Sequence, residues 1–227
     1  MKTIKYITLL CTLITIVFLS LYGYTPPNTN TINKETTICI LPLNGGVSKH
    51  EMDSAVSYLK STFPTTIIII GENTELPDYC FNGKRYRADS ILNFLSSLDI
   101  KADKIIGLTS KDVSVTRVLQ KNNKKVTYPD FGILGLGKCP GKVCVISSYR
   151  LKNNVNMFAK TVVHEFMHTL GVKHCEHSYC IMQDGKGSGK NMKESNHVHK
   201  NCLTQANQEL YKIVRFRKGR PYYQSQK

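Results

Sequence analysis

The chain has 227 residues, of which 41% are hydrophobic and 21% are charged. These fractions exclude a wholly disordered chain, a collagen-like repeat and a membrane protein with many spans. The 31 lysines and arginines against 16 aspartates and glutamates give a formal net charge of +15, and there are 8 cysteines. Such basicity favours an anionic partner, and so many cysteines favour disulfides or a bound metal.

The N-terminus has the layout of an export signal. Lys2 and Lys5 precede a nearly uninterrupted apolar run over residues 6–21, as in a secretory signal peptide. No A-x-A-like cleavage site follows, and the run is just long enough to span a bilayer. We therefore expect residues 1–24 to be either a signal peptide or an N-terminal membrane anchor. The rest of the chain is expected to be extracytoplasmic, either secreted or tethered to the membrane through residues 6–21.

Residues 25–37 are polar and contain two prolines, so we expect a spacer there. One mixed α/β domain is expected over residues 38–220, followed by a polar tail at 221–227. Right-handed crossovers should place the first strands of this domain side by side, and the apolar run at 65–70 should be buried on both faces. The predicted elements of the first half are strands at 38–41, 65–70 and 104–108 and helices at 48–63 and 88–98.

The second half continues with strands and two longer helices. The strands at 131–136 and 142–148 should form a hairpin around the Pro140-Gly141 turn. Polar composition predicts loops at 120–125 and 184–193. The other predicted elements are a strand at 113–118 and helices at 157–170 and 203–216.

The segment from His164 to Met182, HEFMHTLGVKHCEHSYCIM, carries the chemistry. His164 and His168 are four residues apart on a predicted helix, so their imidazoles lie on one face and can hold a single ion. Glu165 follows the first histidine, where its carboxylate can reach a metal-bound water. Zinc brings the pKa of such a water toward neutral and polarises a scissile carbonyl, and the glutamate then moves the proton.

Gly171 and His174 complete this pattern. Glycine can end a helix in the left-handed conformation, after which the chain reverses and brings His174 back as a third ligand. Three protein ligands leave a fourth position open for water, as a catalytic zinc requires. The sequence therefore predicts one catalytic zinc at His164, His168 and His174, with Glu165 as the catalytic residue.

The pattern H-E-x-x-H-x-x-G-x-x-H with a methionine soon after it resembles that of the metzincin metallopeptidases. Cys175, Cys180 and Met182 give an HC-x4-C-x-M layout similar to that of the archaemetzincins, and the likeness is firm over about residues 143–205. The resemblance implies an α/β (α+β) fold, with a metzincin-like mixed twisted sheet, an active-site helix and a C-terminal helix.

The resemblance also implies roles for particular residues. Met182 would be the turn methionine beneath the metal site. The strand before the active-site helix would form the upper edge of the cleft and pair with an extended peptide substrate. Either 131–136 or 143–148 would serve as that strand.

A second, structural zinc held by four cysteines is a further implication of the family. Cys175, Cys180 and Cys202 match three of these cysteines, but Gln205 stands where the fourth is expected, and glutamine is a poor zinc ligand. Three outcomes stay open. A histidine could complete a Cys3His site, two of the cysteines could form a disulfide as an oxidising compartment favours, or the site could bind zinc weakly. The candidate histidines are His177, His197 and His199.

The other cysteines could form disulfides if these three bind zinc. Cys139 and Cys144 flank the Pro140-Gly141 turn, close enough in a hairpin for a bridge. Cys39 and Cys80 would then pair by elimination.

Two functions follow from these observations. The first is a zinc metallopeptidase of the HExxHxxGxxH type, which hydrolyses peptide bonds in a peptide or protein substrate through a zinc-bound water activated by Glu165. The alternative is a basic, zinc-stabilised binding protein for anionic polymers or surfaces, suggested by the basic clusters at 121–125 and 215–220. No nucleic-acid motif accompanies these clusters, so a nucleic-acid partner is not expected, and we expect a monomer.

Overall fold

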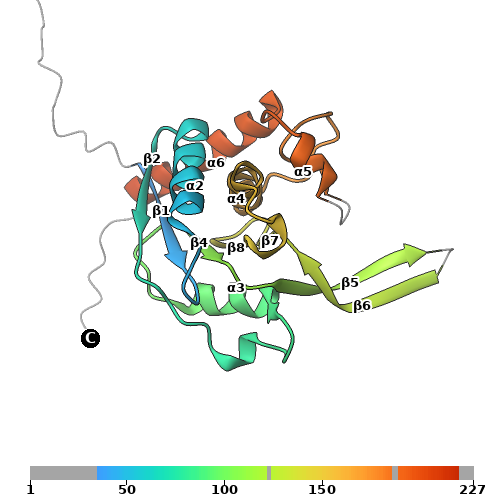
Figure 1. The fold of residues 1–227 in the computed structure, drawn as a ribbon. Coiled ribbons are helices and arrows are strands. Elements are labelled where there is room, and N and C mark those ends of the chain that lie inside the picture. Colours follow the sequence, from blue (N-terminus) through green and yellow to red (C-terminus); the bar gives the residue numbers. More distant parts are fainter. Residues whose placement is uncertain (1–34, 122–123, 186–188, 220–227) are drawn as a thin grey trace, which may run out of the picture. The chain divides into compact units, whose positions relative to one another are not determined.

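A five-stranded sheet forms the centre of the fold (Figure 1). The structure, a computed structural model, describes residues 35–121, 124–185 and 189–219. The strand order is β2-β1-β4-β8-β7, in which the first four strands are parallel and β7 runs antiparallel to β8. The strands are β1 (Thr36–Pro42), β2 (Thr66–Ile70), β4 (Lys104–Thr109), β7 (Gly135–Gly137) and β8 (Val143–Ser147). This mixed sheet with its helices confirms the expected fold class.

Helices cover both faces of the sheet, and successive side chains of each strand point to opposite faces. Ile38 and Ile40 of β1 point into one core, together with side chains of α2, α4 and α6. Cys39 and Leu41 point into the other core, against α3, which lies on the opposite side of the sheet in Figure 1. The helices are α2 (Lys49–Thr62), α3 (Ala88–Ser97), α4 (Val155–Thr169), α5 (Lys190–Glu194) and α6 (Lys200–Gly219).

Helix α2 is bounded by local sequence signals and holds α4 in place. The Ser48 Oγ accepts a hydrogen bond from the Glu51 N–H (3.3 Å), and the Glu51 carboxylate accepts one from the Ser48 N–H (2.8 Å). This reciprocal pair is a capping box, which satisfies two otherwise unpaired backbone donors. At the other end, the Phe63 ring meets Phe166 of α4 edge to face, with 5.2 Å between ring centroids.

The prediction that the run at 65–70 is buried on both faces is wrong. β2 is an edge strand that pairs only with β1 among the described strands. The side chains of Ile67, Ile69 and Ile70 are 41%, 49% and 55% exposed. A continuous apolar run identifies a strand of a parallel sheet, but it does not show whether a second strand or a helix covers it.

The prediction of a loop at 120–125 is also wrong. β5 (Val113–Lys121) and β6 (Lys124–Ile133) run antiparallel almost to their turn and, with β3 (Tyr86–Arg87), form a second sheet. The β5–β6 hairpin projects from the body of the fold (Figure 1). Polar residues are compatible with strands in a ribbon that water reaches on both faces, so composition alone misplaced the loop. In the predicted loop at 184–193, a short helix, α5, begins at Lys190.

The expectations for residues 1–24, for most of the spacer at 25–37 and for the tail at 221–227 lie outside the described residues. Within the described part of the chain, no helix combines the length and the apolar character needed to cross a membrane.

Candidate active site

Helix α4 and the turn that ends it place the predicted ligands. Gly171 has φ of +79°, a left-handed conformation that glycine adopts without strain. The Gly171 N–H donates to the carbonyl of His168 (2.8 Å) and the Val172 N–H to that of Met167 (3.2 Å). These two bonds form a Schellman motif, which ends the helix and reverses the chain. The predicted helix stop at Gly171 is therefore found where the sequence placed it.

The three predicted histidines come together at this reversal. One ring nitrogen from each of His164, His168 and His174 lies within 4.8 Å of the others. The Nε2 atoms of His164 and His168 are 3.1 Å apart, close to the roughly 3.3 Å that two Zn–N bonds of about 2.0–2.1 Å subtend in a tetrahedral site. His164 is buried, His168 is half-buried and His174 is exposed at the mouth of the site.

Backbone carbonyls fix the protonation of the first two rings. The Nδ1 of His164 lies 2.7 Å from the Ile181 carbonyl oxygen, and the Nδ1 of His168 lies 2.7 Å from that of Val172. Because a carbonyl only accepts hydrogen bonds, each Nδ1 must carry the proton, which leaves both Nε2 lone pairs facing one another. Two such acceptors 3.1 Å apart repel unless a cation lies between them, so the donor set fits zinc.

Burial keeps these histidines neutral, as metal ligation requires. Burial lowers the pKa of His164 to about 3, and the neighbouring His168 adds to this effect. Burial also lowers the pKa of His168.

Glu165 is held between the helix and the short edge strand β7. Its carboxyl group is buried, and burial raises its pKa to about 8 against the opposing effect of a hydrogen bond from the Gly137 backbone. A Cβ atom at Gly135 would come within 2.7 Å of the Glu165 Cγ, and one at Gly137 within 2.5 Å of the Glu165 carbonyl oxygen. Only glycine lets β7 approach α4 this closely, so these two residues set the position of the carboxyl group.

A cleft opens in front of Glu165 and follows β7. It consists of two cavities of about 350 Å³ and about 640 Å³. Glu165, His164 and His174 line both of them. The first cavity continues along residues 131–135 and the second along 133–137, so the two are halves of one groove beside the β7 edge. Of the two strands predicted to bind substrate, β7 is the edge strand, whereas β8 lies between β4 and β7.

The turn that carries Met182 lies behind the first histidine. Met182 is completely buried, and its carbonyl accepts a hydrogen bond from the Cys175 N–H (2.8 Å). Its neighbour Ile181 provides the carbonyl that binds His164. The segment therefore contacts the first histidine through Ile181, and the role of turn methionine stays a prediction for Met182.

The three predicted cysteines also meet. The sulfur atoms of Cys175, Cys180 and Cys202 all lie within 4.8 Å of one another. The N–H groups of Met182 and His199 point to the Cys180 sulfur at 3.4 and 3.3 Å, a contact that favours a thiolate. Burial and the neighbouring thiols raise the pKa of Cys202 to about 12, and a bound cation reverses this preference because it stabilises the thiolate.

Gln205 has a different partner. Its Nε2 donates to the Gly171 carbonyl at 3.0 Å, so the amide ties α6 to the end of the active-site helix. Two of the candidate histidines lie near the cysteines instead. A nitrogen of His177 and one of His199 lie within 4.8 Å of the Cys175 sulfur and of each other, whereas His197 hydrogen-bonds to Asn196 and belongs to neither group.

The predicted disulfides are not formed, because all seven cysteines of the described residues are free thiols. Cys144 faces the Ile105 carbonyl in the buried sheet, whereas Cys139 faces the Val172 carbonyl near the surface. Their side chains thus point to different elements although a tight turn joins their strands. Cys39 and Cys80 are both buried in the second core without a bond between them.

Residues outside the histidine motif shape the cleft, and the motif does not reveal them. Gly135 and Gly137 are one example, for which the spacing G-x-G at the end of the strand predicted at 131–136 was the available signal. Arg117 is another, since it lines both cavities from β5, far from the motif in sequence.

The chain is similar to a family of known peptidases. The model of Peptidase family M54 matches residues 48–208. An archaemetzincin of Halobacterium salinarum is 28% identical over 159 residues, which cover 63% of this chain and 83% of that protein. An archaemetzincin of Natronomonas pharaonis is 31% identical over 144 residues, which cover 56% of this chain and 75% of that protein.

Solved structures show the same fold. A crystal structure of archaemetzincin from Methanopyrus kandleri matches with a TM-score of 0.65 and 20% identity, over 78% of this chain and 96% of that one. A crystal structure of archaemetzincin from Archaeoglobus fulgidus in complex with malonate matches with a TM-score of 0.59 and 22% identity, over 75% of this chain and 99% of that one.

Proposed function

The chain belongs to peptidase family M54, the archaemetzincins, and is a zinc-dependent peptidase of this family, in which we propose the following roles for its residues. His164, His168 and His174 hold the catalytic zinc, because their nitrogen atoms converge. When bound there, zinc supplies a Lewis acid that polarises the scissile carbonyl and acidifies water. The observation that carries this proposal is the pair of facing Nε2 lone pairs of His164 and His168.

Glu165 acts as the general base and then as the general acid. Its buried carboxyl group lines the cleft together with the histidines and β7. It takes the proton of the attacking water and returns it to the leaving amine. The hydrogen bond from the Gly137 backbone orients the carboxylate and stabilises its charged form.

The substrate is an extended peptide that pairs with β7. Only one edge of β7 is taken in the described sheet, where it pairs with β8, and the other edge faces the cleft. The backbone groups of that edge, apart from the Gly137 N–H that binds Glu165, can extend the sheet by one strand. Such pairing brings the peptide backbone past Glu165, because Gly135 and Gly137 both contact that residue.

Replacing Glu165 with glutamine tests the catalytic role. We expect Glu165→Gln to keep its full zinc content by elemental analysis and to lose about 10²–10⁴-fold in the rate of peptide hydrolysis. Glu72→Gln, at an exposed position, is the matched control and should hydrolyse peptides at the rate of the native protein. Undiminished hydrolysis by zinc-loaded Glu165→Gln would refute the role of Glu165.

A second, structural zinc is proposed at Cys175, Cys180 and Cys202. The convergence of the three sulfur atoms supports it. A histidine is proposed as the fourth ligand. The His177 Nδ1 lies 3.5 Å from the Cys175 sulfur, about the separation of a thiolate and an imidazole on one tetrahedral zinc, and the His199 ring stacks on that of His177 with 3.6 Å between centroids.

Zinc stoichiometry tests this second site. We expect two zinc ions per native chain, one in Cys202→Ser, and two in Cys139→Ser, which removes an exposed thiol outside the cluster. His177→Ala, His199→Ala and the control His197→Ala then identify the fourth ligand by which of them lowers the occupancy. One zinc per native chain together with an oxidised cysteine of the cluster would contradict the proposal.

Export is proposed from the N-terminal sequence alone. The basic and then apolar layout of residues 1–24 supports a secreted or membrane-tethered enzyme. Expression of the full chain followed by fractionation and N-terminal sequencing distinguishes the two forms. A mature N-terminus beyond residue 24 in the soluble fraction indicates cleavage, an intact N-terminus in the membrane fraction indicates an anchor, and an intact cytoplasmic protein contradicts both.

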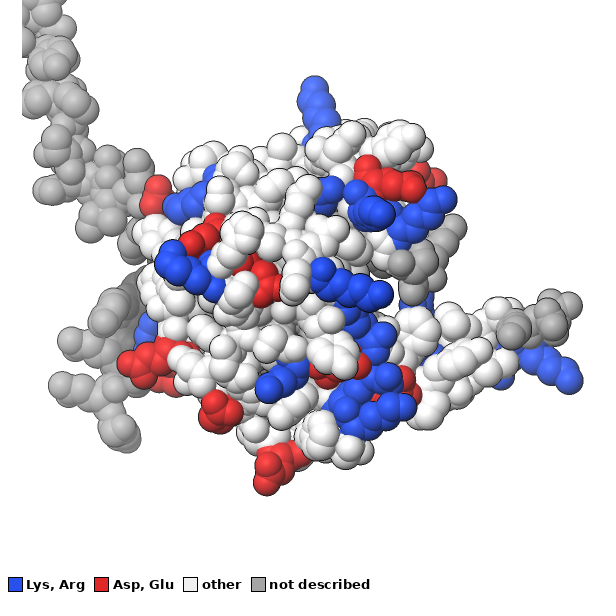
Figure 2. Space-filling model, viewed as in Figure 1, with Lys and Arg blue, Asp and Glu red and all other residues white. Residues whose placement is uncertain are grey.

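The alternative of a polyanion-binding protein gains no support from the face drawn in Figure 2. On the face that Figure 2 shows, lysine and arginine side chains are interspersed with aspartate and glutamate. The basic clusters at 121–125 and 215–220 fall partly outside the described residues.

A further inference from the structure

Arg117 places a guanidinium group in the wall of the catalytic cleft. It is half-buried and lines both cavities that meet at Glu165. Its guanidinium carbon lies 5.0 Å from the centre of the Phe131 ring, a cation–π distance that restrains the side chain.

An irregularity in the β5–β6 hairpin produces this arrangement. Val115 pairs with Phe131 and Arg117 pairs with Tyr128, so Thr116 alone faces Pro129 and Asp130. The extra residue is a β-bulge, and bulges redirect the side chains that follow them. It brings Tyr128 and Phe131 to the same face of β6, with 6.3 Å between ring centroids, and gives Arg117 an aromatic surface to lie on.

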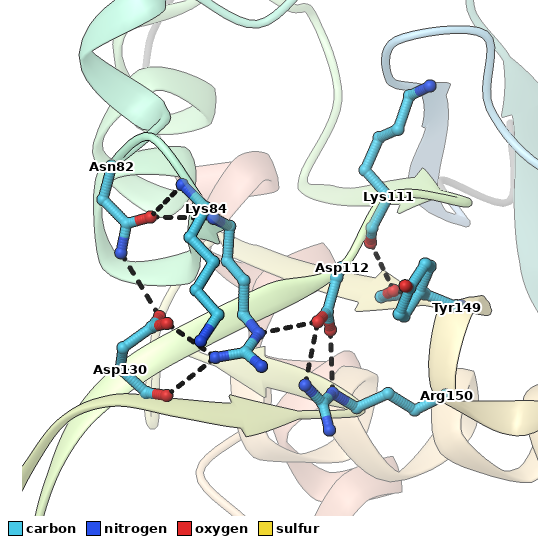
Figure 3. Close-up of polar contacts among 9 residues, drawn as sticks. Asn82, Lys84, Lys111, Asp112, Asp130, Tyr149 and Arg150 are labelled. Carbon is cyan, nitrogen blue, oxygen red and sulfur yellow. Dashed lines mark hydrogen bonds and ion pairs between the residues drawn. The ribbon is translucent and has the colours of Figure 1, made fainter.

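The neighbouring arginines differ from Arg117 because their charges are already paired. Asp112 accepts two hydrogen bonds from Arg150, at 2.7 and 2.8 Å (Figure 3). It accepts a third from Arg85 at 2.7 Å, and Arg85 also pairs with Asp130 at 2.6 Å. In this network the charges of two arginines are compensated by those of two aspartates. The network also fixes the Arg150 guanidinium against Gly132 in the wall of the cleft.

Arg117 has no such partner among residues 35–121, 124–185 and 189–219. No carboxylate of these ranges lies within 4.0 Å of its guanidinium. Besides Glu165, three other charged side chains line the cleft, namely Arg150, Asp184 and Lys173. Arg150 is paired with Asp112, Asp184 has interactions of its own and Lys173 is exposed. A restrained, half-buried cation without a counter-ion beside a catalytic centre is suited to bind an anion of the substrate.

We propose that Arg117 binds a carboxylate of the peptide substrate and so determines specificity, an inference that rests on the proposed peptidase function. The carboxylate belongs either to an aspartate or glutamate side chain or to the C-terminus of the peptide. Antiparallel pairing is the more stable arrangement. In that arrangement the C-terminal part of a peptide paired with β7 extends from Gly135 toward Phe131, where Arg117 lies. The carboxylate is therefore on the C-terminal side of the scissile bond.

Paired peptides test this specificity in the zinc-loaded enzyme. A peptide that the native enzyme cleaves is first found in a pooled library by mass spectrometry. It is then made with glutamate or glutamine at each of the three positions after the scissile bond, and each version is made with a free and with an amidated C-terminus. We expect kcat/KM to be about 10- to 100-fold higher for the carboxylate at one position than for its amide, as charged hydrogen bonds allow.

Variants assign the preference to Arg117. In Arg117→Gln, the ratio of kcat/KM for the carboxylate peptide to that for the amide peptide should fall to about one. The zinc content and the kcat/KM for the amide peptide should stay within about threefold of the native values. Arg117→Lys should keep part of the ratio, because lysine retains the charge without the forked geometry. Arg215→Gln, which removes an exposed arginine from α6, is the control for net charge and should leave the ratio unchanged.

The outcomes separate this inference from the function on which it rests. Cleavage with a ratio near one at every position, or an unchanged ratio in Arg117→Gln, overturns the role of Arg117 and leaves the peptidase intact. A preference that is equal at all positions and falls equally in Arg215→Gln indicates general charge attraction and also overturns it.

If no peptide is cleaved, the proposed function fails. A binding experiment then tests whether Arg117 recognises a peptide carboxylate. Immobilised, zinc-loaded Glu165→Gln protein is then compared with the Glu165→Gln/Arg117→Gln protein in capturing peptides from the same library. Enrichment of carboxylate-bearing peptides that the second variant loses supports the inference. Equal enrichment by both variants overturns it.

Discussion

Lys104 is a buried cation at the end of the active-site helix. It is 7% exposed, and its Nζ donates hydrogen bonds to the carbonyls of Gly141 (2.6 Å) and Thr169 (2.7 Å). It thereby satisfies a carbonyl in the last turn of α4, which has no partner within the helix. Burial lowers the pKa of Lys104 to about 8 from the ordinary 10.5.

This lowered pKa predicts how stability depends on pH. Between about pH 8 and 10.5, the folded chain has lost the proton of Lys104 and the unfolded chain still carries it. The unfolded state then binds more protons, so the contribution of Lys104 makes the free energy of unfolding rise with pH across this range. Urea unfolding of the native chain and of Lys104→Met at intervals from pH 7.5 to 10.5 measures the difference.

Other groups titrate in the same range, but they are common to both proteins and cancel in the comparison. We expect the free energy of unfolding of the native chain, minus that of Lys104→Met, to increase as the pH rises. A constant difference would mean that Lys104 keeps its ordinary pKa in the folded state.

At the scale of single residues, the sequence predicted what local spacing determines. The proposed zinc ligands His164 and His168 follow from helical periodicity, and the stop at Gly171 follows from backbone freedom. The partner of Gln205 and the contacts of Cys144 depend on elements far apart in the chain, so neither could be predicted from spacing. The unpaired charge of Arg117 depends on the tertiary contacts by which Asp112 binds the neighbouring arginines, Arg85 and Arg150.

At the scale of elements, strand β2 illustrates what an apolar run leaves open. Its single described neighbour is β1, and its side chains differ in burial although four consecutive residues are isoleucine. Ile68 is half-buried and packs against the first core, whereas Ile69 is 49% exposed.

These two isoleucines form a matched pair for a stability measurement. Both Ile68→Ala and Ile69→Ala lose the same intrinsic preference for a strand, so the difference between them reports burial. We expect Ile68→Ala to reduce the free energy of unfolding by about 1 kcal/mol more than Ile69→Ala. Equal losses in urea denaturation would indicate that the outer face of β2 is covered in solution.

Most elements of the fold were predictable because each has a clear period or a clear boundary. Helix α2 has its capping serine, Ser48, and helix α4 has its apolar face and its glycine stop. The length of the β5–β6 hairpin was not predictable. Its pairing depends on cross-strand hydrogen bonds, which a polar sequence such as 120–125 neither requires nor excludes.

At the scale of the whole molecule, the β5–β6 hairpin contributes its base to the cleft and little to the core. Arg117 and Phe131 lie at the base and line the first cavity. Farther out, Val118 is 56% exposed, and neither Leu119 nor Val126 belongs to the two cores of the described residues.

Shortening the hairpin tests this division. Val118 pairs with Thr127, so residues 119–126 can be replaced with Asn-Gly, the two-residue loop that suits a hairpin. We expect the melting temperature to fall by no more than a few degrees and the zinc content to stay unchanged, as measured by circular dichroism and elemental analysis. Loss of cooperative unfolding or of zinc would show that the distal hairpin supports the fold.

The proposed pairing of substrate with the edge of β7 has a consequence for what the enzyme can digest. An edge of three residues, Gly135–Gly137, can pair only with a backbone whose own N–H and C=O groups are free. A helix or a central strand of a folded target has already committed these groups, so it must unravel before it can enter. Chain ends, long surface loops and damaged or nascent polypeptides meet this condition at once. With the proposed pairing at β7, we therefore expect local unfolding of the target, as much as its sequence, to set which bonds are cut.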